Sequence, residues 1–195
     1  PAAVMDRFPA ALELLQQPGD LPGYSSIVVH VAGEHLGRWN DGVALLEKVV
    51  RLPLFRPNTP EGKAVWRSMA VLHHCTGNKA RALECEVGGR TGGAVPAASD
   101  RARILAIAAS ALAGQNRVDD AIAAFDEALS LISYGPRRED PVARALAVTG
   151  NNLACAIEEK PTRSARETSL MLKAATAARK YWEIAGTWLE TERAE

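Results

Sequence analysis

The chain has 195 residues, which is enough for one large domain or two small ones with a buried core. Hydrophobic residues make up 47% and charged residues 24%, as in ordinary globular proteins, while only 5% of residues are aromatic. The 23 basic and 23 acidic residues balance, so charge gives no basis for binding nucleic acid or an anionic membrane. No apolar run in the sequence is long enough to span a membrane.

The cysteines and the N-terminal stretch indicate where the protein works. Cys75, Cys85 and Cys155 lack the close paired spacing of a disulfide framework or a zinc site, which favours reduced thiols. The first residues include the charged Asp6 and Glu13, which a signal peptide would not carry at these positions. We therefore expect a cytoplasmic protein that has no cofactor and binds neither nucleic acid nor a membrane.

Apolar residues recur at helical spacing along most of the chain, and Gly- and Pro-rich stretches separate these segments. The one β-branched run, SSIVVHV at residues 25–31, keeps the same register and is interpreted as helix. We therefore predict an all-α chain that forms a single domain over residues 1–195. In chain order, the expected elements are an N-terminal helix 2–17, helix pairs at about 24–52, 61–87, 100–132 and 140–184, and the start of a further helix at 187–195.

Short polar residues mark where several of these helices begin, because their side chains can accept a hydrogen bond from the first free backbone N–H groups. Pro141 stands at a first helical position, where its missing N–H costs nothing. The expected N-caps, in chain order, are Ser25 or Ser26, Asp100, Asp140 and, for the longest helix, Thr162 or Ser164.

A fixed period underlies the pattern of helix, short turn, helix and longer loop. Small residues near the start of each second helix lie 40 and 39 residues apart, and positions in the first helices keep the same spacing. These landmarks are Gly42, Ala82 and Ala121 in the second helices and His30, Ala70 and Ala109 in the first. A bundle of unrelated helices would not usually hold that register, so we predict a repeated helix pair.

The clearest copy contains AGQNRVDDAIAAFDEALSLI at residues 113–132. Its Ala109, Ala121, Phe125 and Ala128 resemble the small and bulky packing positions of tetratricopeptide repeats, and Trp66 matches that family's favoured aromatic position in the preceding copy. The likeness covers residues 24–185, although the period is near 40 residues and not the family's usual 34. The resemblance implies antiparallel helix pairs stacked into a right-handed superhelix, with a concave groove lined by the first helices.

The same resemblance implies a non-catalytic scaffold that binds a protein or peptide in this groove. The groove positions with side chains suited to recognition are Arg67, His74, Arg103, Arg144 and Asn151. Arginine suits the bidentate recognition of carboxylates, and asparagine is unusual on an otherwise apolar helix.

Two alternatives remain open from the sequence. The groove of a regulatory sensor would take a signal peptide or small ligand, with an output domain beyond Glu195. An enzyme or metal protein would use His73, His74 and Cys75, although adjacent helical residues point in different directions. The Gly-rich GGRTGG segment is interpreted as a flexible loop and not as a phosphate cradle, and no standard catalytic motif is present.

Overall fold

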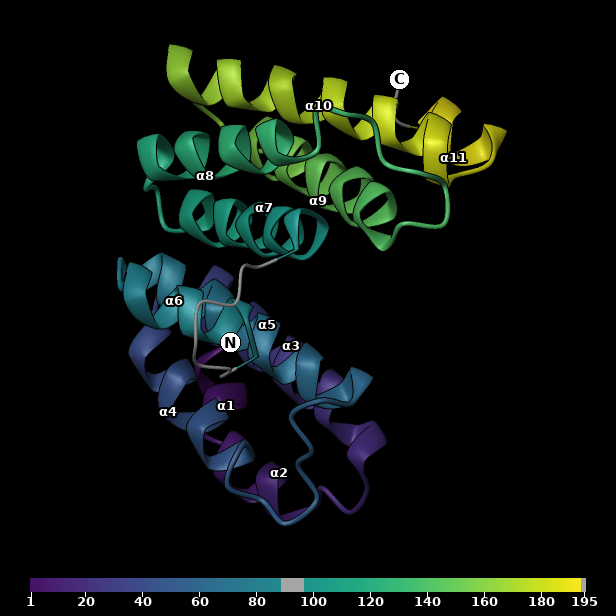
Figure 1. The fold of residues 1–195 in the computed structure, drawn as a ribbon. Helices are drawn as coiled ribbons and strands as arrows, with labels where there is room; N and C mark the ends of the chain where they lie inside the picture. Colours follow the sequence, from purple (N-terminus) through teal and green to yellow (C-terminus); the bar gives the residue numbers. More distant parts are fainter. Residues whose placement is uncertain (89–96, 194–195) are drawn as a thin grey trace. The chain divides into compact units, whose positions relative to one another are not determined.

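The computed structural model describes residues 1–88 and 97–193 (Figure 1). Every regular element in this part is helical, including the β-branched run at 25–31, which confirms the all-α prediction. The chain divides into two compact units, residues 1–96 and 97–195, each with its own internal packing. Most of the Gly-rich segment predicted to be a loop lies outside the described residues.

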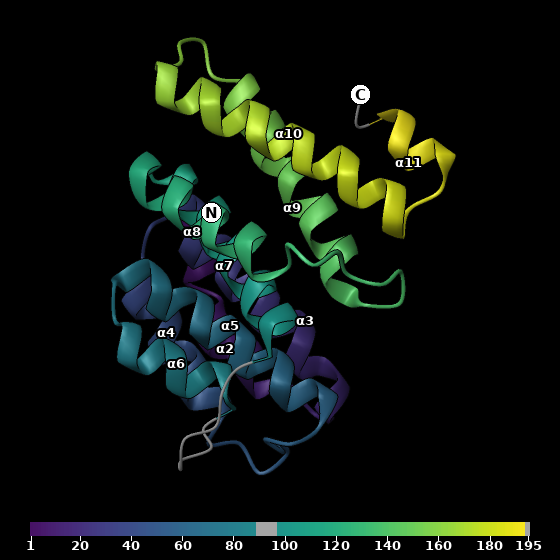
Figure 2. The same ribbon diagram turned by 45° about the horizontal axis from the view of Figure 1, so that its top comes forward.

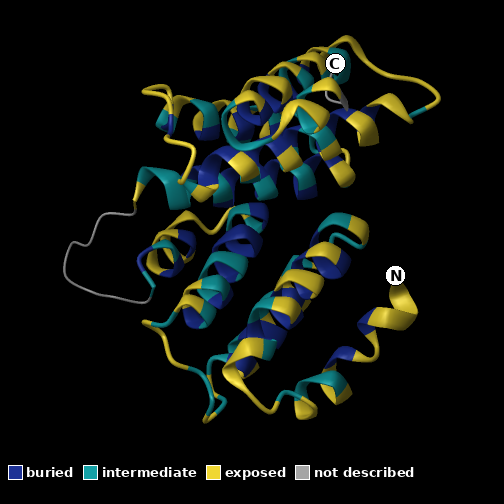
Figure 3. Ribbon diagram, turned by 90° about the vertical axis from the view of Figure 1, so that its right-hand side faces the viewer, coloured by how far each residue is buried: buried dark blue, intermediate teal, exposed yellow. Residues whose placement is uncertain are grey.

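The N-terminal unit is built around one central helix. Its elements are α1 (Ala2–Met5), α2 (Phe8–Glu13), a 3₁₀ turn (Pro18–Asp20), α3 (Leu21–Val28), a π-helix (Val29–His35), α4 (Trp39–Val49), α5 (Pro60–Thr76) and α6 (Lys79–Glu86). Helix α5 contacts α3, α4 and α6, so the core of this unit lies along it. Buried and exposed residues alternate along these helices at helical spacing (Figure 3).

Two predictions for the N-terminal region are wrong. The expected helix 2–17 is broken after Met5, because Pro9 lacks the N–H that would bond the Met5 carbonyl in a continuous helix. The next helix begins at Leu21, because Pro22 falls in its first turn, where no N–H donor is needed. Ser25 is therefore a buried interior residue whose Oγ donates to the Pro22 carbonyl at 3.1 Å, and it is not an N-cap.

The C-terminal unit consists of two antiparallel helix pairs and a short final helix. Its elements are α7 (Ala98–Gly114), α8 (Val118–Leu131), α9 (Pro141–Glu158), α10 (Ala165–Ala185) and α11 (Trp188–Arg193). Helices α7 and α8 pack along their length, as do α9 and α10 (Figure 2). The two pairs meet mainly through α7 and α9, whereas α8 and α10 contact each other at few residues.

The N-caps of α9 and α10 confirm the sequence prediction. The Asp140 carboxylate accepts from the Val142 N–H at 3.0 Å, and Ser164 forms a reciprocal capping box with Glu167. The prediction of Asp100 as a cap is wrong, because α7 begins at Ala98 and Asp100 lies in its first turn.

Small residues mark the places where helices cross closely. A Cβ on Gly150 of α9 would lie 2.8 Å from the Ala174 carbonyl oxygen of α10. A Cβ on Gly42 of α4 would lie 3.3 Å from the Ala32 Cβ, so Ala32 fills the crossing position that the periodic alignment gave to His30. The His30 side chain is instead 57% exposed.

Candidate functional site

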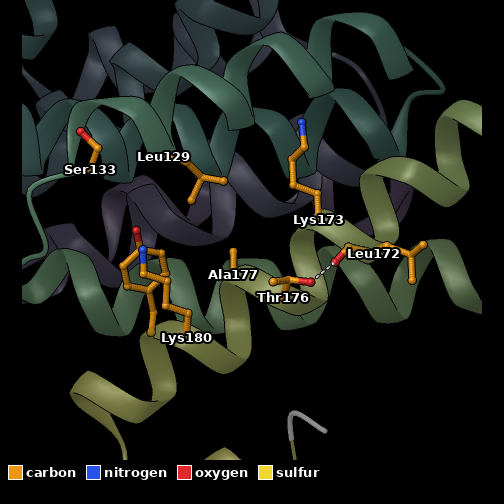
Figure 4. A pocket seen from close by; sticks show the side chains of 8 residues that line it. Leu129, Ser133, Leu172, Lys173, Thr176, Ala177 and Lys180 are labelled. Atoms are coloured by element: carbon orange, nitrogen blue, oxygen red, sulfur yellow. Dashed lines mark hydrogen bonds between the residues drawn. The ribbon is translucent and has the colours of Figure 1, made fainter.

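A pocket opens between α8 and α10 in the C-terminal unit (Figure 4). These two helices contact each other at few residues, although each packs closely against the other helix of its pair, and the gap between them has a volume of about 440 Å³. Both helices contribute side chains to its walls. The lining residues are Leu129 and Ser133 on the α8 side, and Leu172, Lys173, Thr176, Ala177, Lys180 and Tyr181 on α10.

The walls of this pocket are mostly apolar. Tyr181 is 2% exposed, and burial, assisted by the nearby Tyr134, raises the pKa of its hydroxyl above the ordinary value. The Leu172 side chain, by contrast, is 59% exposed. Part of the apolar surface of the pocket is therefore open to a ligand.

The charged groups of the pocket are both cationic, Lys173 and Lys180. Lys173 Nζ lies 2.5 Å from Asp126 Oδ1 of α8, so its charge is already paired. Lys180 Nζ lies 5.4 Å from the centre of the Tyr181 ring and, within the described residues, has no carboxylate partner. The arrangement suits an apolar group that carries a carboxylate beside it.

Two of the predicted arginines occupy matching positions in the C-terminal unit. Ser99 Oγ donates to Asp140 Oδ2 at 2.6 Å, which ties the start of α7 to the start of α9. Arg103 and Arg144 each lie one turn further along these helices, so they stand at the same level on neighbouring helices. Asn151 lies two turns beyond Arg144 on the same face of α9. The structure therefore places all three predicted residues on the first helices of the unit, with Arg103 on α7 and both Arg144 and Asn151 on α9.

The arginines of this first-helix face already have local partners. Arg103 lies 3.5 Å from the Asp100 carboxylate, and the Arg144 guanidinium lies 5.3 Å from the centre of the Trp182 ring on α10. The pKa of Glu190 is lowered by hydrogen bonds from Thr187 and, less strongly, by the charge of Arg144. Arg144 therefore leans toward α10 and α11.

The other two predicted site residues lie in the N-terminal unit. Arg67 is half-buried on α5. His74 Nε2 lies 2.6 Å from Glu86 Oε1, and this carboxylate side chain is 0% exposed. The turn at Gly77 folds α6 back onto α5, which brings Glu86 to His74. His74 thus faces its own partner helix, where its imidazole is already paired with a carboxylate.

The His73–Cys75 triplet forms no metal-binding arrangement. His73 is buried, and desolvation lowers the pKa of its imidazole, while Cys75 is fully buried in the core. Burial raises the pKa of the Cys85 thiol to about 12, so this group stays protonated and unreactive at neutral pH. Within residues 1–88 and 97–193, no group of three or more His, Cys, Asp or Glu side chains is placed to hold a metal ion.

Comparisons of the chain with family models, with curated proteins and with solved structures find no match. None of the described helices combines the length and the apolarity that crossing a membrane requires. Sequence reasoning missed the pocket because it sought the site on the first helices. The available signal was Leu172, an apolar residue of α10 that lies off the buried stripe formed by residues such as Leu170 and Ala174.

Proposed function

We propose that the chain is a non-catalytic helical-repeat protein that binds a segment of a partner protein in the α8–α10 pocket. The observation that carries this proposal is an open, mostly apolar pocket with an ammonium group, Lys180, that has no carboxylate partner in the described part of the chain. A pocket of this size accepts a bulky side chain and not a whole folded domain. The partner therefore presents an extended or helical peptide segment.

The repeated helix pairs support a scaffold role. In both units the helix pairs stack on one another, and close crossings occur at small residues such as Gly42 and Gly150. We propose that the pairs follow the tetratricopeptide arrangement, in which stacked helices form a right-handed superhelix that presents an extended binding surface. The free thiols of Cys75, Cys85 and Cys155 support a cytoplasmic location.

The pocket chemistry defines the ligand class. Leu172 loses exposed apolar surface when an apolar side chain enters, and burial of such a side chain contributes about 1.5–3 kcal/mol. Lys180 pairs with a carboxylate near that side chain, which adds orientation and selectivity. The expected ligand is a peptide with Leu, Ile, Phe or Trp next to Asp or Glu.

The experiment is a selection of random displayed peptides on the purified protein, followed by affinity measurement with synthetic copies. We expect enriched peptides to combine a bulky apolar residue with an adjacent acidic one. The double variant Leu172→Asp, Lys180→Glu should weaken their binding by about tenfold or more, because it removes both contacts. Exchange of the peptide's acidic residue for lysine should partly restore binding to Lys180→Glu.

The matched control is Arg144→Ala, Asn151→Ala on the first-helix face. Peptides that occupy the α8–α10 pocket should bind this variant as they bind the wild type. If the peptides lost binding to this control and kept binding to the pocket variant, the binding site would lie on the first-helix face and not in the pocket. Failure to enrich any peptide would refute the proposed function.

A further inference from the structure

Two exposed histidines come together on the π-helix of the N-terminal unit. In an α-helix, residues five apart are separated by about 140° around the axis, so His30 and His35 would point in different directions. The π-helix closes i→i+5 hydrogen bonds, as in the 3.1 Å bond from the Leu36 N–H to the Val31 carbonyl, and stacks residues five apart. This local register places His30 and His35 on one side.

Two local hydrogen bonds accompany this unusual helix. The Trp39 indole Nε1 donates to the Gly33 carbonyl at 3.2 Å, and the Arg38 N–H donates to the Ala32 carbonyl at 2.7 Å. Both bonds tie the end of the π-helix to the start of α4. The histidines project from this anchored segment, and both are exposed.

The distances fit a pair of metal ligands. His35 Nε2 lies 3.1 Å from His30 Nε2, and the two ring centres are 4.5 Å apart. An ion bonded to both nitrogens at the usual 2.0–2.1 Å would subtend an angle of about 100°, between the tetrahedral and octahedral values. The remaining coordination positions would be open to water.

Glu34 contacts the other ring nitrogen of His30, on the side away from His35. Its Oε2 lies 2.5 Å from His30 Nδ1, and because a carboxylate accepts, the proton of this bond belongs to Nδ1. His30 Nε2 is then the acceptor of the 3.1 Å hydrogen bond and His35 Nε2 is its donor, so an ion bound to both nitrogens would replace the His35 Nε2 proton. A carboxylate behind a ligating histidine is the usual second partner in metal sites, where it fixes the tautomer and raises the basicity of the imidazole.

We propose that His30 and His35 form a binding site for one divalent transition-metal ion, with Glu34 as a positioning residue that is not itself a ligand. Two imidazoles select Zn²⁺, Ni²⁺ or Cu²⁺ over Mg²⁺ and Ca²⁺, which prefer oxygen ligands. Cu²⁺ binds more tightly than Zn²⁺, as expected from the general order of affinities for nitrogen ligands. This inference is independent of the peptide pocket, which lies in the other unit.

The test is isothermal titration of the purified chain with zinc chloride and with copper chloride. We expect one ion per chain, no heat of binding with magnesium chloride, and loss of the site in His30→Gln and in His35→Gln. Glu34→Gln should weaken zinc binding by about 10–100-fold without removing the site. Electron paramagnetic resonance of the copper form should show coupling to two imidazole nitrogens.

Cys155→Ser is the matched control, because Cys155 is an exposed thiol on another helix, and it should bind the ions as the wild type does. The substituted histidines are exposed, so circular dichroism should show unchanged helix content in every variant. Absence of one-to-one binding would overturn the proposal. Unchanged zinc affinity in both histidine variants would overturn it as well.

Discussion

Gly150→Ala tests whether the small residues at helix crossings determine the packing of the C-terminal unit. The new Cβ would lie 2.8 Å from the Ala174 carbonyl oxygen and 3.2 Å from the Ala178 backbone nitrogen. Both are backbone atoms, so no flexible side chain can move aside. Helices α9 and α10 would have to separate along a contact that extends over their length.

The magnitude follows from two opposing terms. Overpacking of a well-packed contact costs about 1–3 kcal/mol, and the clash with backbone atoms puts this site in the upper part of that range, about 2–3 kcal/mol, whereas alanine is favoured over glycine in a helix by about 1 kcal/mol. We expect a net loss of about 1–2 kcal/mol in the free energy of unfolding. For a domain of this size, that loss lowers the melting temperature by roughly 5–15 °C.

Gly23→Ala is the matched control for this prediction. Gly23 lies in α3, and a Cβ there meets nothing within 4 Å, so the substitution should leave stability unchanged or raise it by up to about 1 kcal/mol. Thermal and urea unfolding followed by circular dichroism measure both variants. A Gly150→Ala protein as stable as the wild type would refute the close-crossing argument.

Two further predictions concern ionisation and reactivity. Hydrogen bonds from Lys160 and from the Ser164 backbone lower the pKa of Glu167 from 4.5 to about 2. The ionised carboxylate therefore stabilises the fold above about pH 4.5, and this stabilisation is lost as the pH falls through about 2. Urea unfolding should show that Glu167→Gln is less stable than the wild type at pH 7 and equally stable near pH 2. Cys155 is exposed and Cys85 is buried with a pKa of about 12, so a thiol reagent should label one cysteine rapidly in the folded chain. Rapid labelling of Cys85 in the native protein, followed by peptide mapping, would contradict the packing described for α6.

The sequence predicted the helices that local chemistry specifies. Asp140 before Pro141, and Ser164 three residues before Glu167, define helix starts through contacts within a single turn. The helix break near Pro9 could also have been predicted from the sequence, because proline lacks the N–H that a continuous helix needs. The prediction instead followed the apolar periodicity, which continues across this position.

Features that depend on irregular hydrogen bonds, or on contacts between distant segments, were not predictable in this way. The π-helix accompanies a bond from Trp39 to Gly33, and helical periodicity does not reveal such a bond. The pocket arises because α8 and α10 contact each other at few residues, a relation between segments that are far apart in the chain. His74 faces α6 because the following turn folds Glu86 back to it. Of the five predicted site residues, Arg103 and Arg144 stand at the same level on α7 and α9 because they share the repeat register.

The uneven contact between the two helix pairs of the C-terminal unit has a mechanical consequence. The two pairs contact each other closely along α7 and α9 and at few residues along α8 and α10, so the α7–α9 contact can act as a hinge. A small rotation about the α7–α9 contact therefore mainly changes the distance between α8 and α10. A peptide side chain bound between Leu129 and Leu172 would hold α8 and α10 apart. Binding in the pocket would therefore change the curvature of the unit.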